Sequence, residues 1–256
     1  MFIPYAGVTG FVSRSEIRKV FSVVPEGRPL MCGVLVSTKS LAGERNRWWK
    51  RYPEPATIPD IFMADKRVVN LLHVAFGNGL SPVLLGNLVS LVNRSGWGLL
   101  NGFQFNGAWP RDEDLALLPG DAFPAGFRVV LQVRPLRSSF SFALADAVKQ
   151  AREAGKIRRA TDVLIDASGG RGEPIDLALA DIYVRAFRQH ASRLHVGIAG
   201  GLCAAEMPRV HDLVSRAGLS VDAEGALRDG DEGGTLNVER AKEYLKLAYQ
   251  AQGHAS

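Results

Sequence analysis

The sequence predicts an α/β fold of the (β/α)8 barrel (TIM barrel) class, on three observations. Eight short apolar runs occur along the 256 residues, and most are followed by an amphipathic stretch of helical period. Two of the later runs end abruptly in glycine-rich turns. A chain with 46% hydrophobic residues can bury one large core at this length, so we expect residues 1–256 to form one barrel domain.

The expected strands are the eight apolar runs themselves. They are Met1–Val8, Leu30–Ser37, Val69–Phe76, Leu99–Phe105, Arg128–Val133, Asp162–Ile165, Leu194–Ala199 and Leu219–Ala223. Because strands that alternate with helices form parallel sheets, eight such units favour a closed barrel with an outer ring of helices. A doubly wound open sheet with fewer strands is the alternative architecture.

The expected helices follow from apolar residues that recur with a period of 3.6. Such faces are formed by Leu144, Val148 and Ala151, by Val210, Leu213, Val214 and Ala217, and in a closing helix over Val238–Tyr249 by Leu245, Leu247 and Ala248. Helix starts are indicated by Ser15 with Glu16, by Ser81-Pro82, and by Glu206 before Pro208.

A long connection at residues 39–60 interrupts this alternation. It is longer than a usual strand-to-helix loop and contains Trp48, Trp49, Tyr52 and three prolines. The sequence leaves three interpretations open: a lid over a ligand site, an interface patch, and an ordinary insertion.

Charge and cysteine content limit the classes of partner. The formal net charge is +5 and the arginines are scattered, which favours small anionic ligands over nucleic acid, because a nucleic-acid groove would need a long basic stripe.

The two cysteines show neither metal-ligand spacing nor a disulfide framework, so we expect a reducing, cytoplasmic compartment. No apolar run approaches ~18 residues, so we expect no membrane partner. No metal or cofactor is implied, and a homodimer is left open.

Two neighbouring turns indicate where the chemistry lies. Asp166 ends the run Val163-Leu164-Ile165 and is followed by a glycine-rich turn, whereas Val196-Gly197-Ile198 runs into Gly200 and Gly201. Glycine turns expose backbone N–H groups that can hold phosphate. Because the carboxyl ends of barrel strands meet at one face, we expect a carboxylate and an anion cradle to share a pocket there. The alternatives for Asp166 are a helix cap and an ion pair with a neighbouring arginine.

The chain resembles the phosphoribosylanthranilate isomerase family in several motifs that occur in the same order. The carrying segments are Ala6-Gly7-Val8-Thr9, Gln104-Phe105-Asn106-Gly107, Asp166 with Gly169-Gly170-Arg171-Gly172 and Ile175-Asp176, and Ala199-Gly200-Gly201-Leu202. The resemblance implies a (β/α)8 barrel that rearranges a phosphoribosylamine. In that reaction one group protonates the furanose oxygen while another removes a proton from the neighbouring carbon.

The resemblance also implies roles for residues of this chain. It implies Asp166 as the general acid or base and Lys39, after the second strand, as a cation near the substrate carboxylate. Substrate binding falls to Gln104, Asn106 and Arg171, and phosphate binding to Gly200, Gly201 and Gly225. Lys39 and Arg171 are open to another interpretation as solvated side chains.

One position departs from the family pattern. The family's catalytic base is a cysteine in the first strand, and the matching residue here is Ala6, which cannot accept a proton. Cys32 is expected in the core, Cys203 beside the phosphate cradle, and no site role is expected for the five histidines. Two further hypotheses therefore stand beside the isomerase or lyase. The barrel could bind a ligand or assemble without catalysis, or Asp166 could act on a carbonyl compound that Lys39 steadies, by charge or as a Schiff base.

Overall fold

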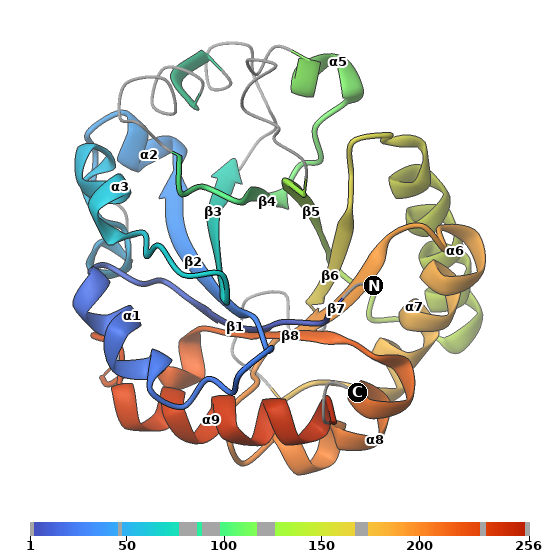
Figure 1. Cartoon of the computed structure of the whole chain (residues 1–256). Helices are drawn as coiled ribbons and strands as arrows, with labels where there is room; N and C mark the ends of the chain where they lie inside the picture. The colour runs from blue at the N-terminus through green and yellow to red at the C-terminus, as the bar shows by residue number, and fades with distance from the viewer. Residues whose placement is uncertain are drawn as a thin grey trace.

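A computed structural model of the chain shows a closed barrel of eight parallel strands (Figure 1). The structure describes residues 3–45, 48–76, 86–88, 98–116, 126–166, 174–230 and 234–253. Each strand pairs with the next along the chain, and β8 pairs with β1 to close the ring. The open-sheet alternative is therefore excluded.

The strands lie close to the expected apolar runs. They are β1 (Ala6–Thr9), β2 (Leu30–Ser37), β3 (Val68–Phe76), β4 (Gly102–Gly107), β5 (Arg128–Val133), β6 (Asp162–Asp166), β7 (His195–Ala199) and β8 (Ser220–Ala223). The largest difference is in β1, where the apolar run predicts a strand from Met1 but the ladder begins at Ala6.

Helices surround the barrel in the described part of the chain (Figure 1). The α-helices are α1 (Arg14–Phe21), α2 (Thr38–Leu41), α3 (Ile58–Ile61), α5 (Asp112–Ala116), α6 (Phe140–Lys156), α7 (Leu177–His190), α8 (Met207–Ala217) and α9 (Val238–Ala251). Short 3-10 helices are η1 (Trp49–Arg51), η2 (Pro55–Thr57) and η4 (Gly225–Leu227). The 39–60 segment thus contains α2, η1, η2 and most of α3.

Helix starts were partly predictable. Glu206 precedes α8 and Pro208 lies in its first turn, as the sequence predicts. The start indicated by Ser15 with Glu16 is confirmed to within one residue, because α1 begins at Arg14; the cap is Ser13, which accepts a hydrogen bond from the backbone N–H of Glu16. The start predicted at Ser81-Pro82 lies outside the described residues.

The buried face of α6 agrees with the prediction at Ala151, which is buried, and at Val148, which packs partly buried against the core, but not at Leu144. Ala143, Ala147, Ala151 and Ala154 are buried, whereas Leu144 is 41% exposed. Small alanines let α6 lie close to the barrel, which turns the larger side chains outward. In α9 the predicted Leu245 and Ala248 are buried and Leu247 is partly buried.

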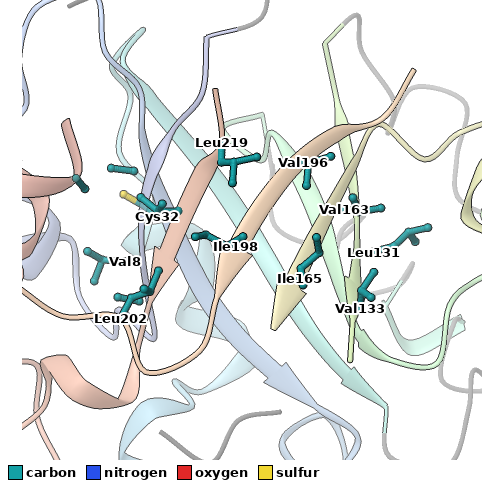
Figure 2. Close-up of a cluster of buried hydrophobic side chains, with 14 of the residues drawn as sticks. Val8, Cys32, Leu131, Val133, Val163, Ile165, Val196, Ile198, Leu202 and Leu219 are labelled. Carbon is teal, nitrogen blue, oxygen red and sulfur yellow. The ribbon is translucent and has the colours of Figure 1, made fainter. Parts of the chain in front are cut away.

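Two groups of apolar side chains lie on the two sides of the strands. The larger group lies between strands and helices and includes Val8, Cys32, Ile165 and Ile198 (Figure 2). A smaller group fills the barrel interior and consists of Tyr5, Met31, Leu71, Val130, Leu164 and Ala199. Because successive side chains of a strand point to opposite faces, membership of a group shows which residues face the barrel interior.

Candidate active site

A polar cavity opens at the carboxyl ends of the strands, above the apolar interior. It encloses about 100 Å³. Its polar lining comes from all eight strands or the segments that follow them: Thr9, Arg51, His73, Gln104, Asn106, Gln132, Asp166, Asp222 and Glu224, together with the backbone of Gly200, Gly201 and Gly225. Most of the residues that the sequence predicts for a site are therefore brought together here.

Asp166 occupies the last position of β6 and faces this cavity. It is 5% exposed, and the side-chain amide of Gln132 donates a 2.8 Å hydrogen bond to its Oδ2. The other end of the amide, Oε1 of Gln132, is buried and has no hydrogen-bond partner. An unpaired buried acceptor is costly, so this cavity is polar enough to receive a ligand or water.

Asp222 is a second buried carboxyl group in the cavity, and sequence reasoning missed it. It lies on β8 and is 5% exposed. Burial, together with the negative charges of Glu224 and Asp166, raises the pKa of Asp222 well above its ordinary value. Asp222 therefore favours the protonated form, in which a carboxylic acid can donate a proton. The signal that could have found it is its place at the end of the eighth expected strand.

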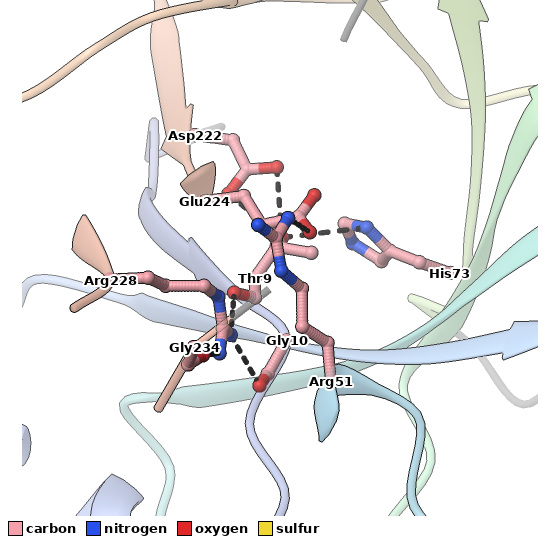
Figure 3. Close-up of polar contacts among 8 residues, drawn as sticks. All are labelled: Thr9, Gly10, Arg51, His73, Asp222, Glu224, Arg228 and Gly234. Carbon is pink, nitrogen blue, oxygen red and sulfur yellow. Dashed lines mark hydrogen bonds and ion pairs between the residues drawn. The ribbon is translucent and has the colours of Figure 1, made fainter. Parts of the chain in front are cut away.

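Thr9 and His73 line the same cavity and form a chain of side-chain contacts with Asp222. The Thr9 hydroxyl oxygen lies 2.9 Å from both carboxyl oxygens of Asp222 and 3.4 Å from Nδ1 of His73 (Figure 3). Burial lowers the pKa of His73 to about 3, so the ring is neutral near pH 7. Its Nε2 is buried without a hydrogen-bond partner. His73 was given no role from the sequence, yet it faces the cavity.

Within the described residues, Arg51 is the arginine or lysine that lines the cavity, and the long 39–60 segment supplies it. Its guanidinium lies 2.8 Å from Glu224 Oε1 (Figure 3). The same group lies 4.7 Å from the centre of the Trp48 ring. Because the Arg51 side chain is 15% exposed, the ion pair is largely shielded from water. Of the three interpretations of this segment, the structure favours one in which it covers part of the site.

Lys39 does not line the cavity. It is exposed in α2, the short helix that follows β2. A Schiff-base role for Lys39 therefore gains no support from the geometry. Arg171 lies outside the described residues.

Gln104 and Asn106 occupy alternate positions of β4 and both line the cavity. The amide nitrogen of Gln104 donates a 3.0 Å hydrogen bond to Oδ1 of Asn106. Oε1 of Gln104 is buried without a partner. This leaves a fixed acceptor in the cavity, suited to a hydroxyl or amine of a ligand.

The glycine turns contribute backbone rather than side chains. Gly200 and Gly201 have φ values of 103° and 66°, in a region that favours glycine. Within the described residues, the N–H groups of Gly201 and Gly225 make no backbone hydrogen bond. Because α8 begins only at Met207, these N–H groups belong to the turn after β7 and not to the first turn of a helix.

Arg228 holds the end of β1 in place. Its buried guanidinium donates hydrogen bonds to the carbonyl oxygens of Thr9 (3.1 Å), Gly10 (2.6 Å) and Gly234 (3.0 Å) (Figure 3). A Cβ at Gly10 would lie 2.2 Å from this guanidinium, so only glycine fits there. Arg228 thus fixes Thr9 against Asp222.

The position matched to the family cysteine does not face the cavity. Ala6 belongs to the outer apolar group, whereas its neighbour Gly7 faces inward, where a Cβ would lie 3.0 Å from Oδ1 of Asp222. Cys32 is fully buried in the outer group, as expected, and burial raises the pKa of its thiol. Cys203 is partly buried and also packs against the outer group. Neither cysteine lines the cavity.

Two properties of the described residues bear on metal binding and on membrane insertion. No group of three or more histidine, cysteine, aspartate or glutamate side chains among them is arranged to hold a metal ion. None of the helices in that part of the chain has the length and apolar character needed to cross a membrane.

Comparison with solved structures places the chain among known barrels. N-(5'-phosphoribosyl)anthranilate isomerase from Pyrococcus furiosus superposes with a TM-score of 0.64 at 17% identity, over 96% of this chain and 98% of that chain. The isomerase from Thermotoga maritima gives 0.61 at 18%, with the same coverage. Orotidine 5'-monophosphate decarboxylase from Methanocaldococcus jannaschii gives 0.52 at 12%, over 97% of this chain and 99% of that chain.

The likeness is one of fold. At these identities the superpositions show the TIM-barrel fold and no particular activity. No protein-family model and no curated protein sequence matches the chain. The function must therefore be argued from the cavity.

Proposed function

We propose that the chain is an enzyme of the isomerase or lyase type that acts on a small phosphorylated, sugar-like substrate, with Asp166 as a general acid or base. The observation that carries the proposal is the placement of two buried carboxyl groups, Asp166 and Asp222, in one cavity with unpaired backbone N–H groups. Barrels of this class hold their chemistry at this end of the strands.

Proton transfer between two positions needs one group that gives a proton and one that takes it. Burial raises the pKa of Asp222 and so favours its protonated form, which suits the donor role. The Thr9 hydroxyl donates to the carboxyl oxygens of Asp222 and so holds this group in place at the cavity. Asp166 then accepts the proton that the substrate loses. Each such group contributes about 10²–10⁴-fold to the rate.

The substrate's anionic group is assigned to the N–H groups of Gly201 and Gly225, with Gly200 shaping the turn. Arg51 supplies the nearest cation, although Glu224 now occupies it. Gln104 and Asn106 orient the hydroxyl groups, since their side chains form the opposite wall. The fold likeness to two phosphoribosylanthranilate isomerases supports a phosphorylated substrate of this kind.

The test is solvent exchange with a panel of substrates. The protein is incubated in D₂O with aldose and ketose phosphates and with phosphoribosylanthranilate, and deuterium uptake and product formation are followed by mass spectrometry. We expect uptake at the carbon beside the reacting carbonyl or amine, and its loss in Asp166→Asn. Neither uptake nor product with any substrate, together with no phosphate affinity at the cavity, would refute the proposal.

A non-catalytic binding protein is the second candidate, and one observation favours it. Within the described residues no cysteine lines the cavity, so the family's base is absent whether its position is Ala6 or Gly7. Because Gly7 faces Asp222, the Gly7→Cys variant would place a thiol in the cavity. Ala6→Cys is the matched control, because it places the thiol in the outer apolar group. Phosphate binding without turnover in the wild type and in Gly7→Cys would favour this candidate.

A further inference from the structure

A second, basic hollow lies at the other end of the barrel. It encloses about 710 Å³ and is lined at the amino ends of the strands by Glu26, Arg28, Lys66, Arg67, Arg128 and His195, with Ile3 and the turn at Gly27 and Pro29. Arg28 and Pro29 precede β2, Lys66 and Arg67 precede β3, and Arg128 and His195 begin β5 and β7. This hollow is thus separated from the candidate active site by the apolar interior of the barrel.

Two of its cations are already neutralised. Arg128 forms a 2.8 Å ion pair with Asp162, and Arg67 lies 3.4 Å from Asp65 and donates to the carbonyl oxygen of Val24. These pairs hold the two guanidinium groups at the wall of the hollow.

Arg28 is different, because its side chain is buried without a negative partner. The residue is 5% exposed, and its guanidinium donates one hydrogen bond, of 3.2 Å, to the neutral side chain of Gln252. Its Nε is buried without any hydrogen-bond partner. Within the described residues it forms no ion pair, and burial lowers its pKa. A shielded cation with no anion beside it is costly, and a bound anion would remove that cost.

The surroundings of Arg28 show what kind of anion fits. Exposed Lys66 adds a second cation, which interacts electrostatically with Asp65 but forms no close ion pair in the described residues. Arg28 also lines a neighbouring hollow of about 380 Å³, whose wall includes Val23, Pro25 and Tyr249. Both volumes lie in the range of small-molecule sites, and the second combines apolar and aromatic surface with the shared cation.

We propose that the amino-terminal end of the barrel binds a small molecule with a phosphate group. The phosphate lies against Arg28 and Lys66, and the organic part of the molecule lies against Tyr249 in the neighbouring hollow. This site is distinct from the proposed catalytic cavity and does not depend on its activity.

The experiment uses two histidines as local reporters. His195 lines the basic hollow and His73 lines the candidate active site, so their ring NMR signals separate binding at the two ends. Inorganic phosphate and phenyl phosphate are titrated at pH 7.5 into the wild type, Arg28→Gln, Lys66→Gln and Lys149→Gln. Lys149 is an exposed lysine of α6 away from the hollow and controls for the loss of one charge.

We expect saturable shifts of the His195 signals with both probes, and tighter binding of phenyl phosphate. Arg28→Gln should weaken binding about tenfold and Lys66→Gln about threefold, whereas Lys149→Gln should not change it. Unchanged His195 signals, or equal affinity in the wild type and Arg28→Gln, would overturn the site. If Arg28→Gln does not fold, Lys66→Gln decides, with unchanged affinity overturning the proposal. Equal affinity for the two probes would overturn the placement of an organic group beside Tyr249.

Discussion

Two aspartates of the same strand show how differently the two ends of this barrel are built. Asp162 begins β6 and Asp166 ends it, and both are buried on the strand's inner side. Asp162 is held by the guanidinium of Arg128 at 2.8 Å and by the hydroxyl of Thr161 at 2.6 Å. Asp166 accepts a 2.8 Å hydrogen bond from the side-chain amide of Gln132 and lines the cavity at the carboxyl ends of the strands.

The difference teaches that the surroundings of an aspartate, and not its residue type, distinguish a carboxylate with a structural role from one that can take part in catalysis. An ion pair with a planar guanidinium, itself 5.4 Å from the centre of the Tyr5 ring, fixes the side chain and occupies its oxygens. An amide partner leaves Asp166 beside buried acceptors that still lack donors, namely Gln104 and Gln132. Function is therefore expected at the Asp166 end.

The largest expected effect comes from Asp166→Asn. If Asp166 moves a proton, the variant should lose about 10²–10⁴-fold of the deuterium-exchange rate with the best substrate of the panel. Its free energy of unfolding in urea should stay within about 1 kcal/mol of the wild type, because an amide can still hydrogen-bond to Gln132. A variant that exchanges at the wild-type rate would remove Asp166 from the mechanism.

The matched change at the other end is Asp162→Asn. It removes one partner of a buried ion pair and leaves the Arg128 guanidinium uncompensated, so the free energy of unfolding should fall by about 3 kcal/mol. Exchange at the distant cavity should remain close to the wild-type rate while the protein is folded. Urea denaturation compares the two variants directly, and equal stability losses would break the contrast between them.

The order of elements could be predicted from the sequence because β-strands of a barrel read as short apolar runs. Seven of the eight strands begin within three residues of the predicted position. The exception is β1, which begins at Ala6 and not at Met1. The face of α6 could be predicted only in part, because its contact is made by alanines while Leu144 remains outside. Hydrophobicity alone favours the larger side chain, but close helix packing favours the smaller one.

The site was predictable only in part, for a different physical reason. Asp166 and the glycine turns follow buried strands and so fall at the barrel mouth. Arg51 comes from inside a long connection whose path the sequence does not define, so the sequence indicated Lys39, which directly follows the second strand, in its place. Ala6 was matched to the family cysteine, but its side chain lies in the outer apolar group, whereas Gly7 faces the barrel interior. An offset of one residue along a strand exchanges the inner and outer faces.

A smaller effect is expected from His73, and it depends on pH. The pKa of His73 falls from its ordinary 6.5 to about 3 on folding, so the unfolded chain binds more protons between these values. The stabilisation is present above pH 6.5 and is lost as the pH falls. Between pH 7.5 and 5 the loss amounts to about 2 kcal/mol.

His73→Gln should therefore reduce the acid sensitivity of the protein by that amount. Urea unfolding of both proteins at pH 7.5 and pH 5 measures it as a difference of differences, in which the contribution of Asp222 is shared. Parallel pH dependences would show that His73 is not shielded from solvent at the cavity.

The smallest expected effect is at the ion pair that closes the cavity. Because the Glu224 side chain is 34% exposed, Glu224→Gln should change the free energy of unfolding by less than about 1 kcal/mol. It frees Arg51 for an anion, so phosphate should bind the cavity about threefold more tightly, as followed by the His73 signals. Arg51→Gln is the opposing control and should weaken binding; tighter binding in both variants would contradict this assignment.

The central claim is that a carboxyl group and an amide-lined anion cradle share the carboxyl-end cavity. A crystal structure of the protein grown with phosphate tests it most directly. We predict an anion between the backbone N–H groups of Gly201 and Gly225, on the side of the cavity toward which the Asp166 carboxyl group points. A cavity without the anion at saturating phosphate, or an Asp166 side chain turned away from it, would contradict the account.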